Sequence, residues 1–121
     1  GFPGTPIIRG NLNAMDKSLL PSLQTVCTEI LNNIAKHGKP GAFAFILSVG
    51  PDAVRIFASN LYNAAINSAP ENHYGTALIQ DFAQQHNGTM TINSENEEWS
   101  LSLTIPLAHQ VKLMFSPTEK L

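Results

Sequence analysis

Two stretches of alternating side chains, each preceded by a helical pattern, constrain the fold of this 121-residue chain most strongly. Apolar residues at every second position predict β-strands that bury one face. In residues 41–60, the sequence Gly-Pro-Asp at 50–52 is typical of a turn between two strands. In residues 89–107, the strict alternation falls on Leu101, Leu103 and Ile105. Each stretch therefore predicts a β-hairpin, and hairpins join antiparallel strands.

The segment before the first hairpin has the clearest helical pattern. Asp16 or Ser18 can cap this helix at its start. Pro21 falls in the first turn, where a missing backbone N–H is tolerated, and Gly38 ends the helix. Apolar side chains recur at helical spacing and predict a buried stripe, which consists of Leu20, Leu23, Cys27, Ile30 and Ile34.

Three further segments complete the pattern. Residues 6–9 predict a short edge strand, because the flanking glycines and prolines are incompatible with a long central one. Residues 76–86 predict a second helix, which Asn87-Gly88 ends and whose shared face consists of Leu78, Ile79, Phe82 and His86. Residues 61–75 form the longest predicted loop, and long loops in compact domains are often functional.

The order of these elements predicts an α+β fold. Strand, helix, two strands, loop, helix and two strands give a mixed sheet with both helices on one face, which is a two-layer α/β sandwich. A doubly wound parallel sheet would need repeated β-α-β units, and the pattern has none. The length suits a single domain, with a core at about 5–107 and a C-terminal tail at 108–121.

Composition excludes several classes of protein. The charged fraction is 13% and the formal net charge is −2, so the chain has no general attraction for nucleic acid or for anionic membranes. No apolar run approaches the roughly 18 residues that span a bilayer. The single cysteine excludes a disulfide within the chain, and Cys27 is expected to be an inert core thiol. The sequence begins with Gly1 rather than Met, so we expect it to be a piece of a longer protein.

Polar residues on the first predicted helix carry the most chemical information. At about 100° per residue, Glu29, Asn33 and Lys36 fall within roughly 60° of arc, beside the apolar stripe. An amide oxygen can coordinate Mg²⁺, and a lysine one turn further on can pair with phosphate, so this line suits a magnesium–nucleotide complex. The same spacing is also typical of an ordinary solvated helix face. The residue pattern alone leaves both interpretations open.

A second signal lies at the start of the second predicted helix. Gly75 precedes this helix and Thr76 follows. A glycine before a helix N-terminus leaves backbone N–H groups accessible to a phosphate, although most such glycines simply form a turn.

Several motifs, in this order, resemble the catalytic ATP-binding domain of sensor histidine kinases, which belongs to the GHKL ATPase superfamily with the Bergerat fold. Residues 29–38, EILNNIAKHG, resemble the N-box of that family, and residues 73–92, HYGTALIQDFAQQHNGTMTI, resemble its second glycine box with the following helix and strand. Residues 45–60 resemble the hairpin that leads to the adenine-binding box. The resemblance covers about residues 5–107. The similar subgroup comprises the kinases that pair with helix-turn-helix response regulators.

The resemblance implies a role for each matching residue. Glu29 would be the general base or water-orienting glutamate, and Asn33 the Mg²⁺-coordinating asparagine. The other nucleotide-binding positions would be Lys36, His37, Asn60, Gly75 and Thr76. Asn60 stands where the family has an adenine-binding aspartate, and Tyr62 and His73 stand where it usually has glycines.

The resemblance also implies cofactors and partners. The domain would bind ATP with Mg²⁺, and the full-length protein would phosphorylate a histidine on an upstream dimerisation domain and then a response regulator. The isolated domain would bind ATP only. The whole protein would be a membrane-anchored homodimer, with this domain in the cytoplasm and no direct contact to nucleic acid. Two alternatives remain, which are a degenerate non-catalytic module of the same fold and a serine kinase of the anti-sigma-factor type.

Overall fold

The structure is a computed structural model that describes residues 4–12, 15, 17–62 and 76–107. Its elements, in chain order, are β1 (Pro6–Gly10), α1 (Leu20–His37), β2 (Phe43–Val49), β3 (Ala53–Leu61), α2 (Thr76–Gln85), β4 (Thr89–Glu95) and β5 (Glu98–Pro106). The five strands form one sheet in the order β1-β2-β3-β5-β4. β1 pairs with β2 in parallel, and every other pair is antiparallel.

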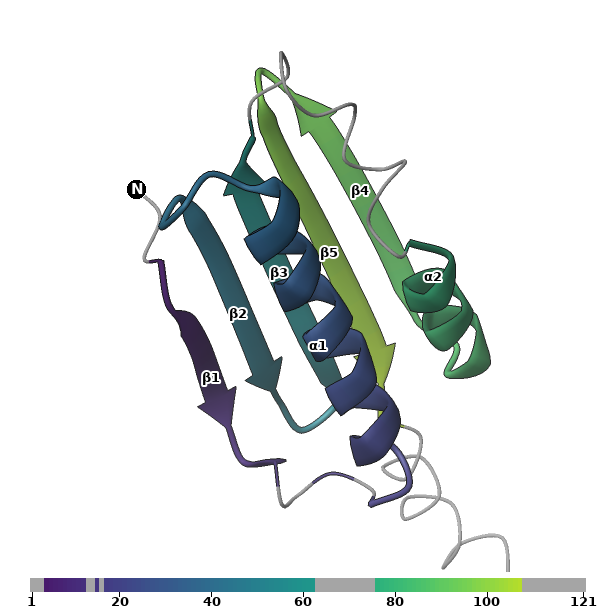
Figure 1. The fold of residues 1–121 in the computed structure, drawn as a ribbon. Helices are drawn as coiled ribbons and strands as arrows, with labels where there is room; N and C mark the ends of the chain where they lie inside the picture. Colours follow the sequence, from purple (N-terminus) through teal and green to yellow (C-terminus); the bar gives the residue numbers. More distant parts are fainter. Residues whose placement is uncertain (1–3, 13–14, 16, 63–75, 108–121) are drawn as a thin grey trace, which may run out of the picture.

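The sheet and the helices form two layers. Both helices lie on the same face of the sheet, with α1 over its centre and α2 beside it (Figure 1). The predicted two-layer α+β sandwich with a mixed sheet is therefore confirmed, and so is the position of β1 at the edge. No helix within the described residues is long and apolar enough to cross a membrane.

Both predicted hairpins are present. β2 and β3 are antiparallel, and the pair nearest the turn is Val49 with Val54. Residues 50–52 therefore lie in the turn, as predicted. β4 and β5 are joined by Asn96 and Glu97, whose φ angles are 54° and 61°. Positive φ at both central residues is the requirement of a tight two-residue hairpin with the right twist. Along β5 the buried side chains alternate as predicted, and they are Trp99, Leu101, Leu103 and Ile105.

The start of α1 differs from the prediction, whereas its end agrees. The N-cap residue is Leu19, and no side chain makes a capping hydrogen bond. Ser18 is therefore not the cap, and Asp16 lies outside the described residues. Pro21 occupies the first turn as expected. Gly38 ends the helix, and its N–H donates to the Ile34 carbonyl at 2.8 Å.

The buried stripe of α1 also differs from the prediction. Leu20 and Cys27 are only half-buried. The buried residues of α1 are Leu23, Val26, Ile30, Asn33 and Ile34. The stripe is rotated toward α2, which packs beside α1 on the sheet, so Val26 and Asn33 are buried although Ser22 and Thr25 stay exposed. The rotation brings the polar Asn33 into the interior.

The second helix matches its predicted range, but its buried face is narrower. Leu78 is 43% exposed, so it is not part of the core as expected. His86 follows the helix and is half-buried, with its ring centroid 4.9 Å from that of Phe82. Asn87 adopts a φ of 58° and Gly88 donates to the Ala83 carbonyl at 2.7 Å, which confirms the predicted helix stop.

Candidate functional site

A groove separates the two helices. It has a volume of about 320 Å³ and is lined by Ser22, Thr25 and Val26 of α1 and by Leu78, Asp81, Phe82 and Gln85 of α2. The helices run in opposite directions, so the start of α2 is level with the C-terminal half of α1 (Figure 1). This half of α1 carries the residues that the sequence singles out. We call the side of α1 that faces α2, with Ser22, Thr25, Val26, Glu29 and Asn33, the site flank.

Glu29 and Asn33 are joined by a hydrogen bond on the site flank. Asn33 Nδ2 donates to Glu29 Oε2 at 3.0 Å, one helical turn away. Asn33 is buried, at 7% exposure, and Glu29 is half-buried. Burial of an amide is unfavourable unless its polar atoms find partners. The pair is therefore a specific, partly buried polar arrangement rather than part of a solvated face.

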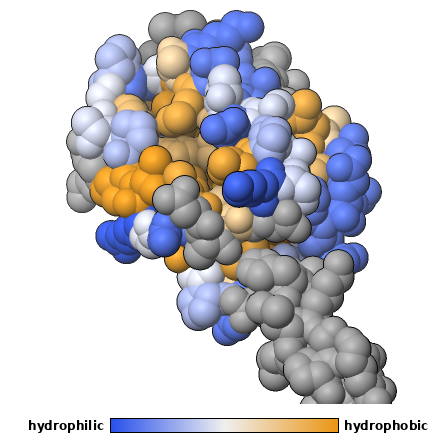
Figure 2. Space-filling model, turned by 90° about the horizontal axis from the view of Figure 1, so that it is seen from below, coloured by the Kyte–Doolittle hydropathy of each residue, from blue (hydrophilic) through white to orange (hydrophobic). Residues whose placement is uncertain are grey.

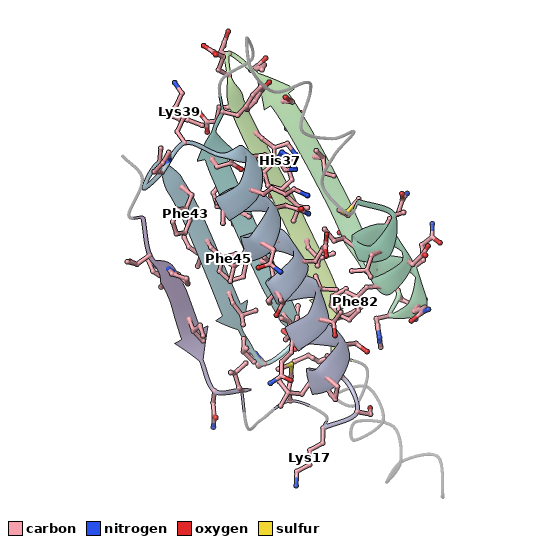
Figure 3. The ribbon with its side chains drawn as sticks, in the orientation of Figure 1. Lys17, His37, Lys39, Phe43, Phe45 and Phe82 are labelled. Carbon is pink, nitrogen blue, oxygen red and sulfur yellow. The ribbon has the colours of Figure 1, made fainter. Side chains whose placement is uncertain are left out.

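The basic residues lie in the last turn of α1. Lys36 is exposed, and His37 is half-buried. Figure 3 shows His37 at the C-terminal end of α1. A cation in the last turn interacts favourably with the helix dipole. Such an ammonium group, one turn beyond Asn33, is in the position in which it can also pair with an anion bound above that residue.

Asn60 lies beneath the end of α1. It is fully buried, at 0% exposure, near the end of β3, where it faces the helical layer. Its Nδ2 donates to the Leu61 carbonyl at 3.1 Å, and the same carbonyl accepts from the N–H of Lys39 at 2.8 Å. Gly38 approaches Asn60 so closely that a Cβ on this glycine would lie 2.9 Å from Asn60 Nδ2. The fold thus brings Asn60 against the helix that carries Glu29 and Asn33.

Tyr62 ties the end of β3 to the neighbouring hairpin. Its hydroxyl lies 2.8 Å from Ser94 Oγ, and its N–H donates to the Glu97 carbonyl at 2.9 Å. The sequence gives no sign of either contact, since the partners are more than 30 residues apart. In the kinases that the sequence resembles, this position is usually a glycine, whereas here it is a buried tyrosine at the end of β3.

The remaining predicted site residues are only partly described. Thr76 is the first residue of α2, but its side chain lies outside the described part. Gly75, His73 and the rest of the predicted loop at 63–75 lie outside the described residues. Of the predicted site residues, the structure therefore joins Glu29 to Asn33. It also places Asn60 against Gly38, the residue that follows His37 at the end of α1.

An apolar groove lies on the opposite side of α1. We call this side, with Leu20, Gln24, Cys27, Thr28 and Leu31, the edge flank, because it faces the edge strand β1. The groove has a volume of about 490 Å³, and its strand side includes Pro6, Ile8, Phe45 and Leu47. From the end at which α1 begins, apolar surface is visible between the polar side chains (Figure 2). Burial on this flank raises the pKa of the Cys27 thiol to about 11, which agrees with the expected inert thiol.

Comparison with known proteins identifies the fold. No protein-family model matches the sequence, and no curated protein matches it significantly. Solved structures do match. The catalytic domain of the histidine kinase ThkA, in a nucleotide-free form, superposes with a TM-score of 0.59 at 10% identity, over 84% of this chain and 76% of that one.

Two further kinases give similar results. The blue-light activated histidine kinase of Erythrobacter litoralis gives a TM-score of 0.65 at 11% identity, over 88% of this chain and 36% of that one. The histidine kinase AdeS of Acinetobacter baumannii gives 0.55 at 10% identity, over 72% of this chain and 46% of that one. The two-layer arrangement of a mixed five-stranded sheet and two helices is therefore the fold of the catalytic domains of histidine kinases.

Proposed function

We propose that this chain is the ATP-binding catalytic lobe of a sensor histidine kinase. The observation that carries the proposal is the buried Asn33 amide, hydrogen-bonded to Glu29, in a fold shared with histidine kinase catalytic domains. An interior helix position with no function usually carries an apolar side chain, because a buried amide is unfavourable unless its polar atoms find partners. An amide at this position supports a role in ligand binding.

The residues present fit a magnesium–nucleotide complex. Mg²⁺ prefers oxygen ligands, and Asn33 supplies an amide oxygen on the site flank. When bound, the metal would neutralise charge on the phosphates. Lys36 adds a positive charge one turn further along α1, and the backbone N–H groups at the start of α2 suit a phosphate.

The base of the nucleotide would lie near Asn60. A carboxamide can hydrogen-bond an adenine edge, as the family's aspartate does. Asn60 has no exposed surface in this structure, so direct contact with a base requires neighbouring side chains to move. We propose that this contact forms on binding, and that Tyr62 limits how far the chain after β3 shifts.

The wider assignment concerns the whole kinase. In the full-length protein, the lobe would transfer the γ-phosphoryl group of ATP to a histidine ring nitrogen of an upstream dimerisation domain, with ADP as the leaving group. That phosphoryl group would then pass to a response regulator of the helix-turn-helix class. The full-length protein would be a membrane-anchored homodimer with this domain in the cytoplasm.

Equilibrium binding tests the proposal. We expect the domain to bind ADP and a non-hydrolysable ATP analogue at sub-millimolar concentration, measured by isothermal titration calorimetry with Mg²⁺ and with EDTA. Asn33→Ala should abolish the part of the affinity that depends on Mg²⁺. Asn32→Ala, an exposed neighbour on the same helix, is the matched control and should bind as the wild type does.

Two rival functions make different predictions. A degenerate interaction module of the same fold would show no saturation at several millimolar nucleotide. A serine kinase of the anti-sigma-factor type would bind nucleotide but would phosphorylate a serine of a separate protein. Phosphohistidine on the full-length protein, detected by its acid lability, would exclude that rival.

A further inference from the structure

We infer that Glu29 is a positioning residue, which holds the Asn33 amide so that its oxygen is presented to the metal of the bound nucleotide. This inference rests on the proposed function and refines it. The resemblance offers Glu29 as a general base or a water-orienting residue. The contact in the structure assigns it a different task.

The orientation of the amide follows from the chemistry of its partner. A carboxylate oxygen accepts hydrogen bonds and cannot donate them. The amide atom that faces Glu29 Oε2 at 3.0 Å must therefore be the nitrogen of Asn33. Since the amide group is planar, Oδ1 points away from Glu29. The side of Asn33 that does not face the carboxylate is thus the side with the metal-binding atom.

Because Asn33 is buried, the orientation of its amide decides which atom faces the metal position. In water an asparagine amide can rotate freely and exchange its two ends at little cost. Asn33 is only 7% exposed, so its NH₂ group depends on protein partners, and a charge-assisted bond is stronger than a neutral one. Without the carboxylate, the amide can turn by 180° and direct N–H groups at the metal position, where they repel a cation.

Helical spacing keeps the two side chains together. Residues four apart lie on the same helical face, and α1 continues for a full turn beyond Asn33 to His37. Ile30 and Ile34, which follow each member of the pair by one residue, are buried against the sheet and fix the rotation of the helix. The pair is therefore held before any ligand arrives, which lowers the entropy cost of binding.

A positioning role and a base role respond differently to substitution. The side-chain carbonyl of glutamine accepts a hydrogen bond from Asn33 Nδ2 as the carboxylate does, but it cannot accept a proton as a base. Alanine does neither. If Glu29 positions Asn33, then Glu29→Gln preserves the Mg²⁺-dependent part of nucleotide binding and Glu29→Ala removes it. If Glu29 is only a base, then both variants bind nucleotide normally and both lose phosphoryl transfer.

The experiment measures nucleotide affinity with and without the metal. Dissociation constants for ADP are determined by calorimetry in excess Mg²⁺ and in EDTA, for the wild type, Glu29→Gln, Glu29→Ala and the exposed edge-flank control Thr28→Ala. We expect Glu29→Ala to lose at least tenfold in affinity in Mg²⁺ and to be unchanged in EDTA. Glu29→Gln and Thr28→Ala should stay within threefold of the wild type under both conditions.

A second readout does not need ligand. In ¹⁵N-labelled protein, the Asn33 side-chain NH₂ protons should exchange slowly with water in the wild type and in Glu29→Gln, and faster in Glu29→Ala. Thermal melting confirms that each variant is folded.

The outcomes separate the two levels of the proposal. Failure of the wild type to bind ADP would remove the proposed function and this role together. Normal Mg²⁺-dependent binding by Glu29→Ala, or equally weak binding by Glu29→Gln and Glu29→Ala, would overturn the positioning role and leave the nucleotide site in place.

Discussion

The two flanks of α1 differ in chemistry, because one packs apolar side chains and the other carries a hydrogen-bonded polar pair. The edge flank meets β1 and β2 with half-buried apolar side chains, among them Leu20, Cys27 and Leu31. The site flank carries Glu29 and the buried Asn33, hydrogen-bonded to each other. Apolar contact on the edge flank stabilises the fold in the usual way. A buried amide on the site flank adds little stability, so the comparison separates a structural side of the helix from the side that we propose to be functional.

The largest effect is expected where the two flanks meet. Ile30 is completely buried between them, and Ile30→Ala removes core contacts without replacing them. Large-to-small core substitutions of this kind cost about 2–5 kcal/mol. Urea denaturation should show a strong drop in the free energy of unfolding. The control Thr28→Ala, at an exposed position, should change it by less than about 0.5 kcal/mol.

A somewhat smaller effect is expected beneath the site flank. In Asn60→Asp, a carboxylate would replace the Nδ2 that donates to the Leu61 carbonyl, so two acceptors would face each other in a fully buried position. Leaving buried polar groups unsatisfied costs about 1–3 kcal/mol, and more when one is charged. Asn93→Asp, at an exposed position on β4, makes the same chemical change as a control. Equal stability of both variants in a thermal melt would show that Asn60 does not depend on this bond.

A pair of exchanged substitutions compares the flanks directly. Asn33→Leu puts an apolar side chain on the site flank, and we expect the free energy of unfolding to change by no more than about 1 kcal/mol, with either sign. Leu31→Asn puts an amide on the edge flank and should lower stability by about 1 kcal/mol. Nucleotide binding should respond in the opposite way, with loss in Asn33→Leu and retention in Leu31→Asn. Normal nucleotide binding by Asn33→Leu in calorimetry would contradict the division into two flanks. A larger loss of stability in Asn33→Leu than in Leu31→Asn, measured by chemical denaturation, would contradict it as well.

The smallest effect on the folded state concerns the Cys27 thiol. Because burial raises its pKa to about 11, only about 0.1% is thiolate at pH 8, and iodoacetamide should react slowly until urea unfolds the chain. The sign for stability follows from the same shift. The neutral thiol is favoured in the folded state, so its contribution is fully present below pH 9 and is lost as the pH rises toward 11. Equal alkylation rates with and without urea would show that the Cys27 thiol is accessible to the reagent in the folded protein.

Local patterns in the sequence were sufficient to predict the elements of the fold. The alternation in β5, the turn at 50–52 and the stop at Asn87-Gly88 each depend on near neighbours, and the structure confirms them. The edge position of β1 followed from its short length and its glycines. These features do not require knowledge of what packs against the element.

Apart from the N-cap of α1, which is Leu19 and not Ser18, the errors and omissions concern contacts between distant segments. The sequence predicts Leu20 and Cys27 in the buried stripe of α1, but both are half-buried. The stripe is instead rotated toward α2, which lies far along the chain. The spacing of Glu29 and Asn33 was visible, but a solvated face has the same spacing. The contacts of Tyr62 with the β4–β5 hairpin leave no local signal. The predicted roles of Gly75 and Thr76 stay predictions.

The tight turn at Asn96 and Glu97 has a practical consequence for protein engineering. Both residues need left-handed backbone angles, and the strands on either side are in continuous register. One extra residue here would shift the pairing of β4 with β5, and such a slip moves every side chain to the opposite face of a strand. Because β3 also holds β5 in register, the slip would fall on the edge strand β4. Met90 and Ile92 would then leave the core, and Tyr62 would lose its anchor at Ser94. Fluorescent tags, affinity peptides and circular-permutation breaks should therefore avoid this hairpin, even though its tip is exposed.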